Sequence, residues 1–443
     1  MKRLLLLPMS CCLLFSAAQA QSWNLLGNAG TNPSIHFVGT TDNQPLRFRI
    51  VNVHAGTLGN DNTSLGKSAG AGITGFGNTA LGVEALKVST SSNYNTGLGW
   101  RSLYSNTSGY LNTASGGAAL IMNTTGSHNT ATGYYALGDN RTGTYNSGFG
   151  LQALGFANSG NTNTAVGAFA AGNTSSGNSN VAVGASALYW NASRSNCVAV
   201  GDSALYWTGY NFPPPTGIQG LGNTGVGSKA LFNNTTGYFN TAMGYRALYA
   251  TTTGNTNTAL GYNAYPTTGT ISNYTGIGYN VGSGSSISNS VEVGNSSVVW
   301  IGGQVGWSTY SDERIKQDIK EDVQGLAFIN KLRPVTYHLN IHRQNDMTRA
   351  AVKDKGEKEW AEKYDIEKRK ITGFLAQEVE QAAKACNYDF HGVTKPSTPD
   401  GLYSLSYADF VVPLVKAVQE QQSVIEKLTK KIEELEKKVE ACA

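Results

Sequence analysis

Small or apolar residues alternate with polar ones in a phrase that recurs along the middle of the chain. The phrase is Asn-Thr-Ala-x-Gly, and it stands at residues 78–82, 163–167 and 257–261 among others. Such alternation is typical of a short, half-buried strand. The glycine that closes each phrase permits a turn or a close approach of two backbones. The pattern therefore predicts a series of short strands, each ended by glycine.

The closing glycines keep a fixed period. They are Gly66, Gly82, Gly99, Gly116, Gly133, Gly150, Gly167, Gly184, Gly201, Gly227, Gly244, Gly261, Gly278 and Gly294. Successive steps are 16 or 17 residues, apart from one step of 26. A fixed period near 20 residues is the signature of a solenoid, and two or more glycines per unit oppose helix. We expect one unit per rung over residues 56–294.

The expected core of this solenoid is thin. Its buried positions are predicted to be Ala, Val, Leu and Gly, and so small a core is marginal by itself. We therefore expect chains to associate laterally, with slow, non-local strand pairing. Stacked asparagines are expected to form hydrogen-bonded ladders from rung to rung.

These units resemble the head repeats of trimeric autotransporter adhesins, which have short N-(S/T)-x-x-x-G units. The resemblance implies a trimeric left-handed β-roll or β-helix stalk. The unit here is longer than in that family, and the family's C-terminal translocator barrel is missing.

One unit is interrupted near residues 207–222. The 26-residue step contains Trp207, Tyr210, Phe212 and three prolines at 213–215. An insertion between rungs must leave the solenoid as a loop. Its aromatic residues are open to two interpretations, a tolerated decoration or a contact for a glycan. Aromatic residues at repeat positions, such as Tyr189 and Trp190, are expected to stack over the rung edges.

The first residues predict export. Two basic residues, an apolar run and an Ala-x-Ala sequence ending at Ala20 indicate a signal peptide over 1–20, with Gln21 as the new terminus. A lipoprotein signal acylated at Cys11 or Cys12 is the rival interpretation. Residues 21–55 are expected to cap the first rung or to attach the protein. No membrane-spanning segment is expected in the mature chain.

Charge divides the chain near residue 310. Residues 1–310 contain 11 Lys or Arg and 6 Asp or Glu, whereas residues 311–443 contain 22 and 23. The two signs are interspersed in the second part, which argues against a nucleic-acid partner. In the first part, Glu84 and Asp139 differ in phase within the repeat, so we expect no glycosidase-type acid pair.

Cysteine and histidine usage suggests no cofactor. Cys197, Cys386 and Cys442 are far apart and odd in number, which favours free thiols over a disulfide framework. His338 and His342 have no Glu or Cys at zinc-site spacing, so ordinary surface or packing roles are favoured and no metal is expected.

Beyond residue 310 the sequence contains four distinctive phrases. They are S-D-E-R-I-K at 311–316, F-I-N-K-L-R-P-V-T-Y at 328–337, G-F-L-A-Q-E-V-E at 373–380 and Y-S-L-S-Y at 403–407. In this order they resemble the endosialidase-type intramolecular chaperone domain, which ends phage tail spikes and other trimeric fibres and cleaves itself. The resemblance implies a mostly α (α+β) chaperone domain over 311–410, after a neck at 295–310.

The family's Ser-Lys dyad falls on Ser311, as nucleophile, and Lys316, as general base. A serine needs such a base to become a nucleophile, and a lysine serves only if burial disfavours its charged form. The resemblance implies cleavage of the Ser311–Asp312 bond, whereas an N-to-O acyl shift would cut Tyr310–Ser311. A second interpretation has Ser311 merely capping a helix that begins at Asp312.

Residues 411–443 carry a heptad pattern. One position holds Val411, Val418, Ile425, Ile432 and Val439, and the other holds Leu414, Gln421, Leu428 and Leu435. β-Branched residues at a with Leu at d usually favour two strands, whereas both family resemblances imply three. We expect a coiled coil in a homotrimer.

The sequence as a whole predicts an exported bacterial fibre or adhesin-like protein, at the cell surface or outside the cell. Its C-terminal domain would act once as a serine peptidase on its own chain, and its partners would be two further copies. One alternative is a glycan-binding surface lectin with a surface glycan or host ligand. Another is a fibre whose C-terminal domain stays attached as a trimer clasp.

Overall fold

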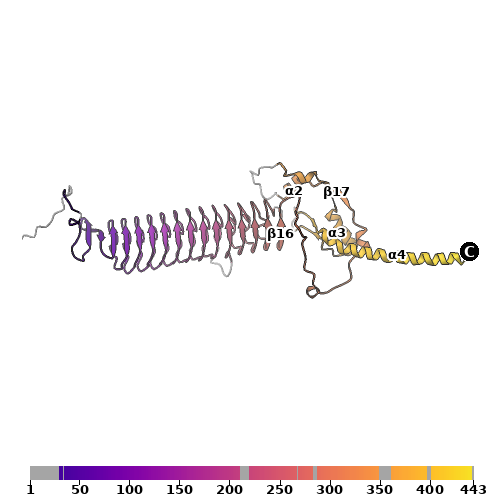
Figure 1. Cartoon of the computed structure of the whole chain (residues 1–443), viewed down its shortest axis with the longest axis horizontal. Coiled ribbons are helices and arrows are strands. Elements are labelled where there is room, and N and C mark those ends of the chain that lie inside the picture. Colours follow the sequence, from indigo (N-terminus) through magenta and orange to yellow (C-terminus); the bar gives the residue numbers. More distant parts are fainter. Residues whose placement is uncertain are drawn as a thin grey trace, which may run out of the picture.

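The computed structural model describes residues 29–32, 34–209, 219–266, 268–282, 287–348, 361–396 and 401–441. It is a long rod of stacked strands followed by a small mixed domain, from which a single helix extends away from the rod (Figure 1). The predicted signal peptide, most of the insertion and Cys442 lie outside the described residues.

The rod is one continuous 16-stranded sheet, and its strands follow each other in sequence order. The fourteen strands from β3 to β16 are parallel and in register, so that Thr113 in β6 faces Thr130 in β7. This confirms the predicted solenoid. Each strand pairs with the strand of the next rung along the chain. The strands are β3 (Asn62–Leu65), β4 (Asn78–Leu81), β5 (Thr96–Leu98), β6 (Thr113–Ser115), β7 (Thr130–Thr132), β8 (Ser147–Phe149), β9 (Thr164–Val166), β10 (Val181–Val183), β11 (Val198–Val200), β12 (Thr224–Val226), β13 (Thr241–Met243), β14 (Thr258–Leu260), β15 (Tyr274–Ile277) and β16 (Ser290–Val293).

A hairpin covers the first rung. Strands β1 (Leu46–Ile50) and β2 (Val53–Leu58) are antiparallel, and β2 pairs antiparallel with β3. The reversal of direction marks where the regular repeat begins. The strand expected near residues 46–53 is therefore present.

The interior of the rod is built from Ala, Leu and Asn. Where a rung has an alanine in its strand and an Ala-Leu pair in the following segment, as at Ala131, Ala136 and Leu137, these residues are wholly buried within one chain. The strand valines point outward instead, and Val166 is 41% exposed. Valine was predicted in the core, where Val281 is indeed 1% exposed, but the strand valines are not buried because Asn, Ala or Gly takes the inward strand positions.

The closing glycines form a spine with positive φ at every rung. Gly116 has φ 140°, and a Cβ there would lie 2.5 Å from the carbonyl oxygen of Gly133 in the next rung. Only glycine lets two rungs approach this closely without strain. The fixed period of the glycines therefore results from the close backbone contacts between successive rungs.

The buried asparagines form the expected ladder. The Oδ1 atom of Asn112 accepts the backbone N–H of Asn129 at 3.0 Å and the Nδ2 of Asn129 at 3.1 Å. That Nδ2 also donates to the carbonyl of Gly143 at 2.9 Å. At one rung Cys197 replaces the asparagine, and its backbone N–H still donates to Asn180 Oδ1 at 3.0 Å.

Leucines that line the interior adopt left-handed backbone. Leu137 has φ 50° and Leu120 has φ 51°, although non-glycine residues avoid this region at a cost of about 1–2 kcal/mol. The N–H of Leu137 donates to Ala153 O at 2.9 Å in the next rung. The segment predicted only to complete each coil is thus a repeated turn, held by bonds between rungs.

Aromatic residues stack between rungs, as expected. Tyr206 lies between Tyr189 and Phe232, with ring centroids 5.5 and 5.2 Å away and near-parallel planes. Trp190 and Trp207 are parallel to within 3°. The register of β11 with β12 continues across the insertion, so the inserted residues do not interrupt the sheet.

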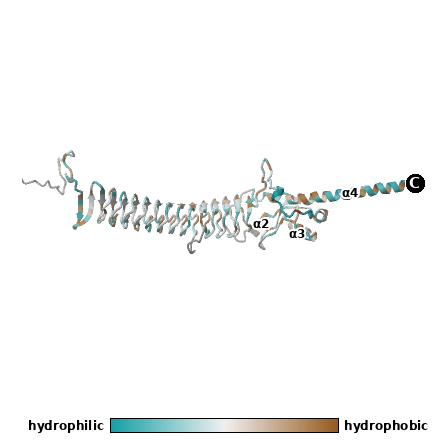
Figure 2. Cartoon of the chain, turned by 90° about the horizontal axis from the view of Figure 1, so that it is seen from below, coloured by the Kyte–Doolittle hydropathy of each residue, from teal (hydrophilic) through white to brown (hydrophobic). Residues whose placement is uncertain are grey.

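The C-terminal part is a small α+β domain with a long helix. Its core holds Phe328, Val379, Ala382, Phe390 and Phe410. Its elements are η1 (Glu313–Ile315), α1 (Leu326–Ile329), β17 (Val335–Tyr337), α2 (Ile341–Thr348), η2 (Asp365–Lys368), β18 (Ile371–Gly373), α3 (Ala376–Ala385), β19 (Val393–Thr394), β20 (Ser404–Leu405), η3 (Tyr407–Phe410) and α4 (Val411–Glu440). Apolar and polar residues mix along α4 as it leaves the domain (Figure 2).

Candidate self-processing site

Ser311 lies where an extended segment enters a single helical turn. The turn is η1, and its N-cap is Asp312, whose side chain accepts the N–H of Arg314 at 2.9 Å. The cap expected at Ser311 therefore belongs to the following residue. This leaves the Ser311 hydroxyl available for another partner.

That partner is Lys316. Its Nζ donates to Ser311 Oγ at 2.8 Å, and the N–H of Lys316 closes the turn on Glu313 O at 3.0 Å. One turn thus returns the lysine to the serine that precedes it. The structure brings together the two residues that the sequence singled out.

Asp312 and Arg314 stabilise the same turn. Arg314 Nη2 lies 2.6 Å from Asp312 Oδ2, and this hydrogen bond lowers the pKa of the carboxyl group. Both side chains are exposed, so the pair contributes little energy. Its structural effect is to fix the carboxylate beside the two peptide bonds at which cleavage is predicted.

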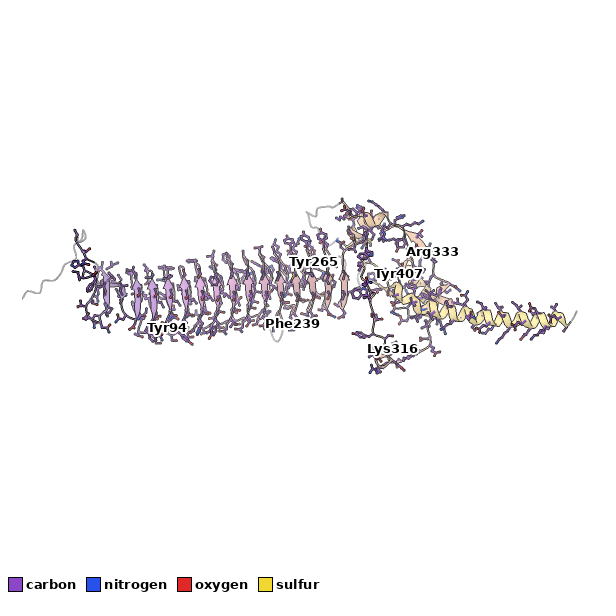
Figure 3. All side chains as sticks on the ribbon, in the orientation of Figure 1. Tyr94, Phe239, Tyr265, Lys316, Arg333 and Tyr407 are labelled. Carbon is purple, nitrogen blue, oxygen red and sulfur yellow. The ribbon has the colours of Figure 1, made fainter. Side chains whose placement is uncertain are left out.

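The surroundings of the dyad are open in the single chain. Figure 3 places Lys316 on a loop away from Arg333 and Tyr407 of the domain. Trp307 and Tyr310, just before the serine, are 96% and 99% exposed. Isolated large aromatics at this exposure are costly to hydrate, so the segment presents apolar surface that its own chain leaves uncovered.

The other sequence phrases form the folded domain. Arg333 Nε donates to Glu378 Oε2 at 3.1 Å, joining the second phrase to the third. The N–H of Phe374 donates to Tyr407 Oη at 3.0 Å, joining the third to the fourth. A Cβ on Gly373 would overlap that same hydroxyl, which explains the glycine. These residues stabilise the fold of the C-terminal domain by joining its segments.

Two contacts that sequence reasoning missed hold the domain to the end of the solenoid. Ser296 Oγ donates to Asn345 Oδ1 in α2 at 2.9 Å. Arg369 Nη1 donates to the carbonyl of Val299 at 2.6 Å. Sequence separations of 49 and 70 residues leave no local pattern by which they could be found.

The remaining candidate groups have ordinary partners. Glu84 pairs with Lys87 and Arg101, and Asp139 accepts the hydroxyl of Tyr135 at 2.8 Å. His342 contacts Glu367 at 3.0 Å. Within the described residues, no helix combines the length and apolar character needed to cross a bilayer.

The described chain is a parallel β-solenoid followed by a small domain and a long helix whose apolar heptad positions are exposed. Residues 311–388 match the family described as chaperone of endosialidase. The match supports a role in trimer assembly of a fibre-like protein. No curated protein and no solved structure matches the chain.

Proposed function

We propose that this chain is an exported homotrimeric fibre whose C-terminal domain aligns three copies and then releases itself by hydrolysis beside Ser311. The observation that carries the proposal is the 2.8 Å hydrogen bond between Lys316 Nζ and Ser311 Oγ. It lies at the start of the region that matches the chaperone family.

The chemistry follows from this contact. An uncharged Lys316 amine takes the proton of Ser311 Oγ, and the oxygen attacks a neighbouring peptide carbonyl. Attack on the carbonyl of Tyr310 breaks the Tyr310–Ser311 bond, frees the amine of Ser311 and leaves an ester that water hydrolyses. The family resemblance favours the Ser311–Asp312 bond instead. The N-terminal residue of the released piece distinguishes the two.

Association of chains would bury Ser311 and Lys316, which are exposed in the single chain. Both dyad side chains are exposed, and a lysine becomes a base only where burial disfavours its charged form. Trp307, Tyr310 and Ile315 offer apolar surface around the dyad for neighbouring copies to cover. Cleavage would then wait for assembly.

The exposed apolar residues at the heptad positions of α4 support association of chains. Its heptad residues Val418, Ile425 and Leu428 are 62%, 49% and 55% exposed. Ala417 and Pro413 are buried against the domain instead. An apolar stripe of this length is stable in water when other helices cover it.

The repeat explains why alignment is needed. Consecutive rungs carry nearly the same phrase, so pairing shifted by one rung preserves most side-chain contacts while placing three chains out of step. A domain that joins three chains at one end fixes the starting rung. Once it leaves, the stalk is held by a kinetic barrier to unfolding.

A denaturing gel of the full chain tests the cleavage. We expect wild type to give a stalk fragment and a C-terminal fragment, and Ser311→Ala and Lys316→Met to give one uncut band. Lys320→Met, which removes an exposed lysine from the same segment, should be cut like wild type. An uncut wild type, or a cut Ser311→Ala, contradicts the proposal.

Light scattering of uncut Ser311→Ala tests the assembly. We expect the mass of three chains for this variant, and a lower mass when Ile425 and Leu428 are also replaced by Asp. Mass spectrometry of the stalk from a secreting host tests export, with Gln21 expected as its first residue. A monomeric Ser311→Ala chain contradicts the trimer.

A further inference from the structure

One arginine lies inside the solenoid. Arg194 is 1% exposed and is among the largest fully buried side chains. Its Nε, Nη1 and Nη2 atoms have no hydrogen-bond partner in the described part of the chain. The buried hydroxyl of the preceding residue, Ser193, also lacks one. Four donors are therefore enclosed without an acceptor.

Arg194 occupies a glycine position of the repeat. The equivalent residues in most other rungs are glycines, namely Gly109, Gly126, Gly143, Gly160, Gly177, Gly220, Gly237 and Gly254, whereas Ser92 and Ile271 hold the position in two further rungs. The Arg194 carbonyl is held as theirs are, since Asn180 and Asn191 both donate to it at 2.9 Å. A Cβ at Gly126 or Gly143 would overlap the backbone of the following rung. A side chain as long as that of arginine therefore needs additional room beside the following rung.

The longer loop of the interrupted rung provides this room. Cys197 Sγ donates to Gly220 O across 23 residues, whereas the equivalent asparagine bonds span 14. The nine extra residues thus lie before Gly220. A Cβ on Gly220 would come within 2.6 Å of Arg194 Nε, and one on Gly209 within 3.4 Å. The arginine stem therefore passes the two glycines that flank the insertion.

No ion pair with the guanidinium forms among the residues that the structure describes. None of the carboxylates in the described part of the solenoid forms an ion pair with Arg194, and residues 207–222 contain no Asp or Glu. Burial raises the pKa of the nearby Cys197 thiol to about 11, so that thiol is neutral at pH 7. Burial also lowers the pKa of Arg194, but a guanidinium remains charged at neutral pH.

We propose that Arg194 binds a small inorganic oxyanion, of the phosphate or sulfate class, enclosed within the solenoid. An isolated buried charge is strongly unfavourable, and an arginine cannot relieve it by losing its proton. The planar fork of the guanidinium suits two oxygens of one anion. At 1% exposure the group is out of reach of a partner protein, so its ligand would have to be a small ion.

The test uses the full chain and its own anion content. Wild-type protein is exchanged into chloride buffer and denatured, and released phosphate and sulfate are measured by ion chromatography. The same protein is titrated with phosphate, at constant ionic strength, while its thermal midpoint is recorded. We expect either one equivalent of oxyanion per chain or saturable stabilisation by phosphate that chloride does not give.

Two variants and one control assign the effect. Arg194→Gly reinstates the residue of the neighbouring rungs, and Arg194→Gln keeps the length without the charge. Both should release no oxyanion and bind phosphate at least about tenfold more weakly, as loss of a charge-assisted hydrogen bond implies. Arg141→Gln, which removes an exposed arginine from the same rod, should behave as wild type. Wild type without released oxyanion or phosphate response overturns the proposal, as does an Arg194 variant that keeps either.

Discussion

Glu420 in the long helix caps the helix that opens the chaperone core. Its Oε2 accepts the N–H of Leu326 at 2.8 Å, across 94 residues of sequence. The N-cap residue of α1, Gly325, has no side chain with which to do this. Helix α4, whose heptad positions are exposed, is thereby bonded directly to the domain core.

Replacing Glu420 by Ala should destabilise the C-terminal domain. Loss of a helix cap costs about 1 kcal/mol, and α1 also loses a negative charge at its N-terminal end. We expect a lower urea midpoint for the helical signal at 222 nm. Glu433→Ala, an exposed change further along α4, should leave the midpoint unchanged. Equal midpoints for the two variants would show that the cap carries no stability.

Replacing Asn129 by Ala should weaken the stalk. The change removes the acceptor of the Asn146 N–H, which is 2.9 Å from Asn129 Oδ1, and the donor to Gly143 O. Each buried group left without a partner costs about 1–3 kcal/mol. Asn129→Cys should cost less, since Cys197 already fills this position of the ladder. Thermal unfolding of the three proteins checks the order, and an alanine variant as stable as wild type would contradict it.

Adjacent glycines should respond differently to alanine. Gly116→Ala places a Cβ 2.5 Å from Gly133 O at φ 140°, so we expect a loss of about 3 kcal/mol or more. Gly117→Ala meets only the ring of Tyr134, at 3.4 Å, and should be nearly neutral. Denaturant unfolding of both variants measures the difference. Similar losses would refute the assignment of the spine to Gly116.

Acid should weaken the chaperone domain through Glu380. Hydrogen bonds from Lys384 and Lys395 lower the pKa of this carboxyl group to about 2, from an ordinary value of 4.5. A depressed folded-state pKa gives stability that is present above pH 4.5 and is lost as the pH falls towards 2. Glu380→Gln should flatten the pH dependence of the unfolding midpoint in that window. Glu433→Gln should not, and an unchanged profile for Glu380→Gln would exclude this pair as the cause.

The stalk was predictable because every rung repeats the same short sequence and the same contacts with its neighbours. The backbones of Gly116 and Gly133 are in close contact, and the buried Asn112 and Asn129 are joined by a hydrogen bond. Because both contacts recur with the period of the repeat, the spacing of these residues in the sequence is enough to locate them. The outward valines and the left-handed leucines were not predictable from alternation. That pattern does not say which face of a strand lies inside, and the backbone of Leu137 is set by bonds to the next rung.

The candidate site was only partly accessible to the same reasoning. Ser311 and Lys316 are close in sequence and were paired by a family resemblance, which the hydrogen bond between them supports. The Glu420 cap and the Arg369–Val299 contact join residues far apart in the chain. Arg194 did have a signal, since a charged residue stands at a repeat position that is mostly glycine, but the importance of that residue depends on its burial.

The contacts of Ser296 with Asn345 and of Val299 with Arg369 straddle Ser311 in the sequence. A break in the backbone beside that serine would leave two pieces still bound to each other through these bonds. Scission and departure would then be separate events with separate rates. A nicked fibre would remain whole under native conditions and come apart in denaturant, and the strength of this small junction would set how long the intermediate lasts.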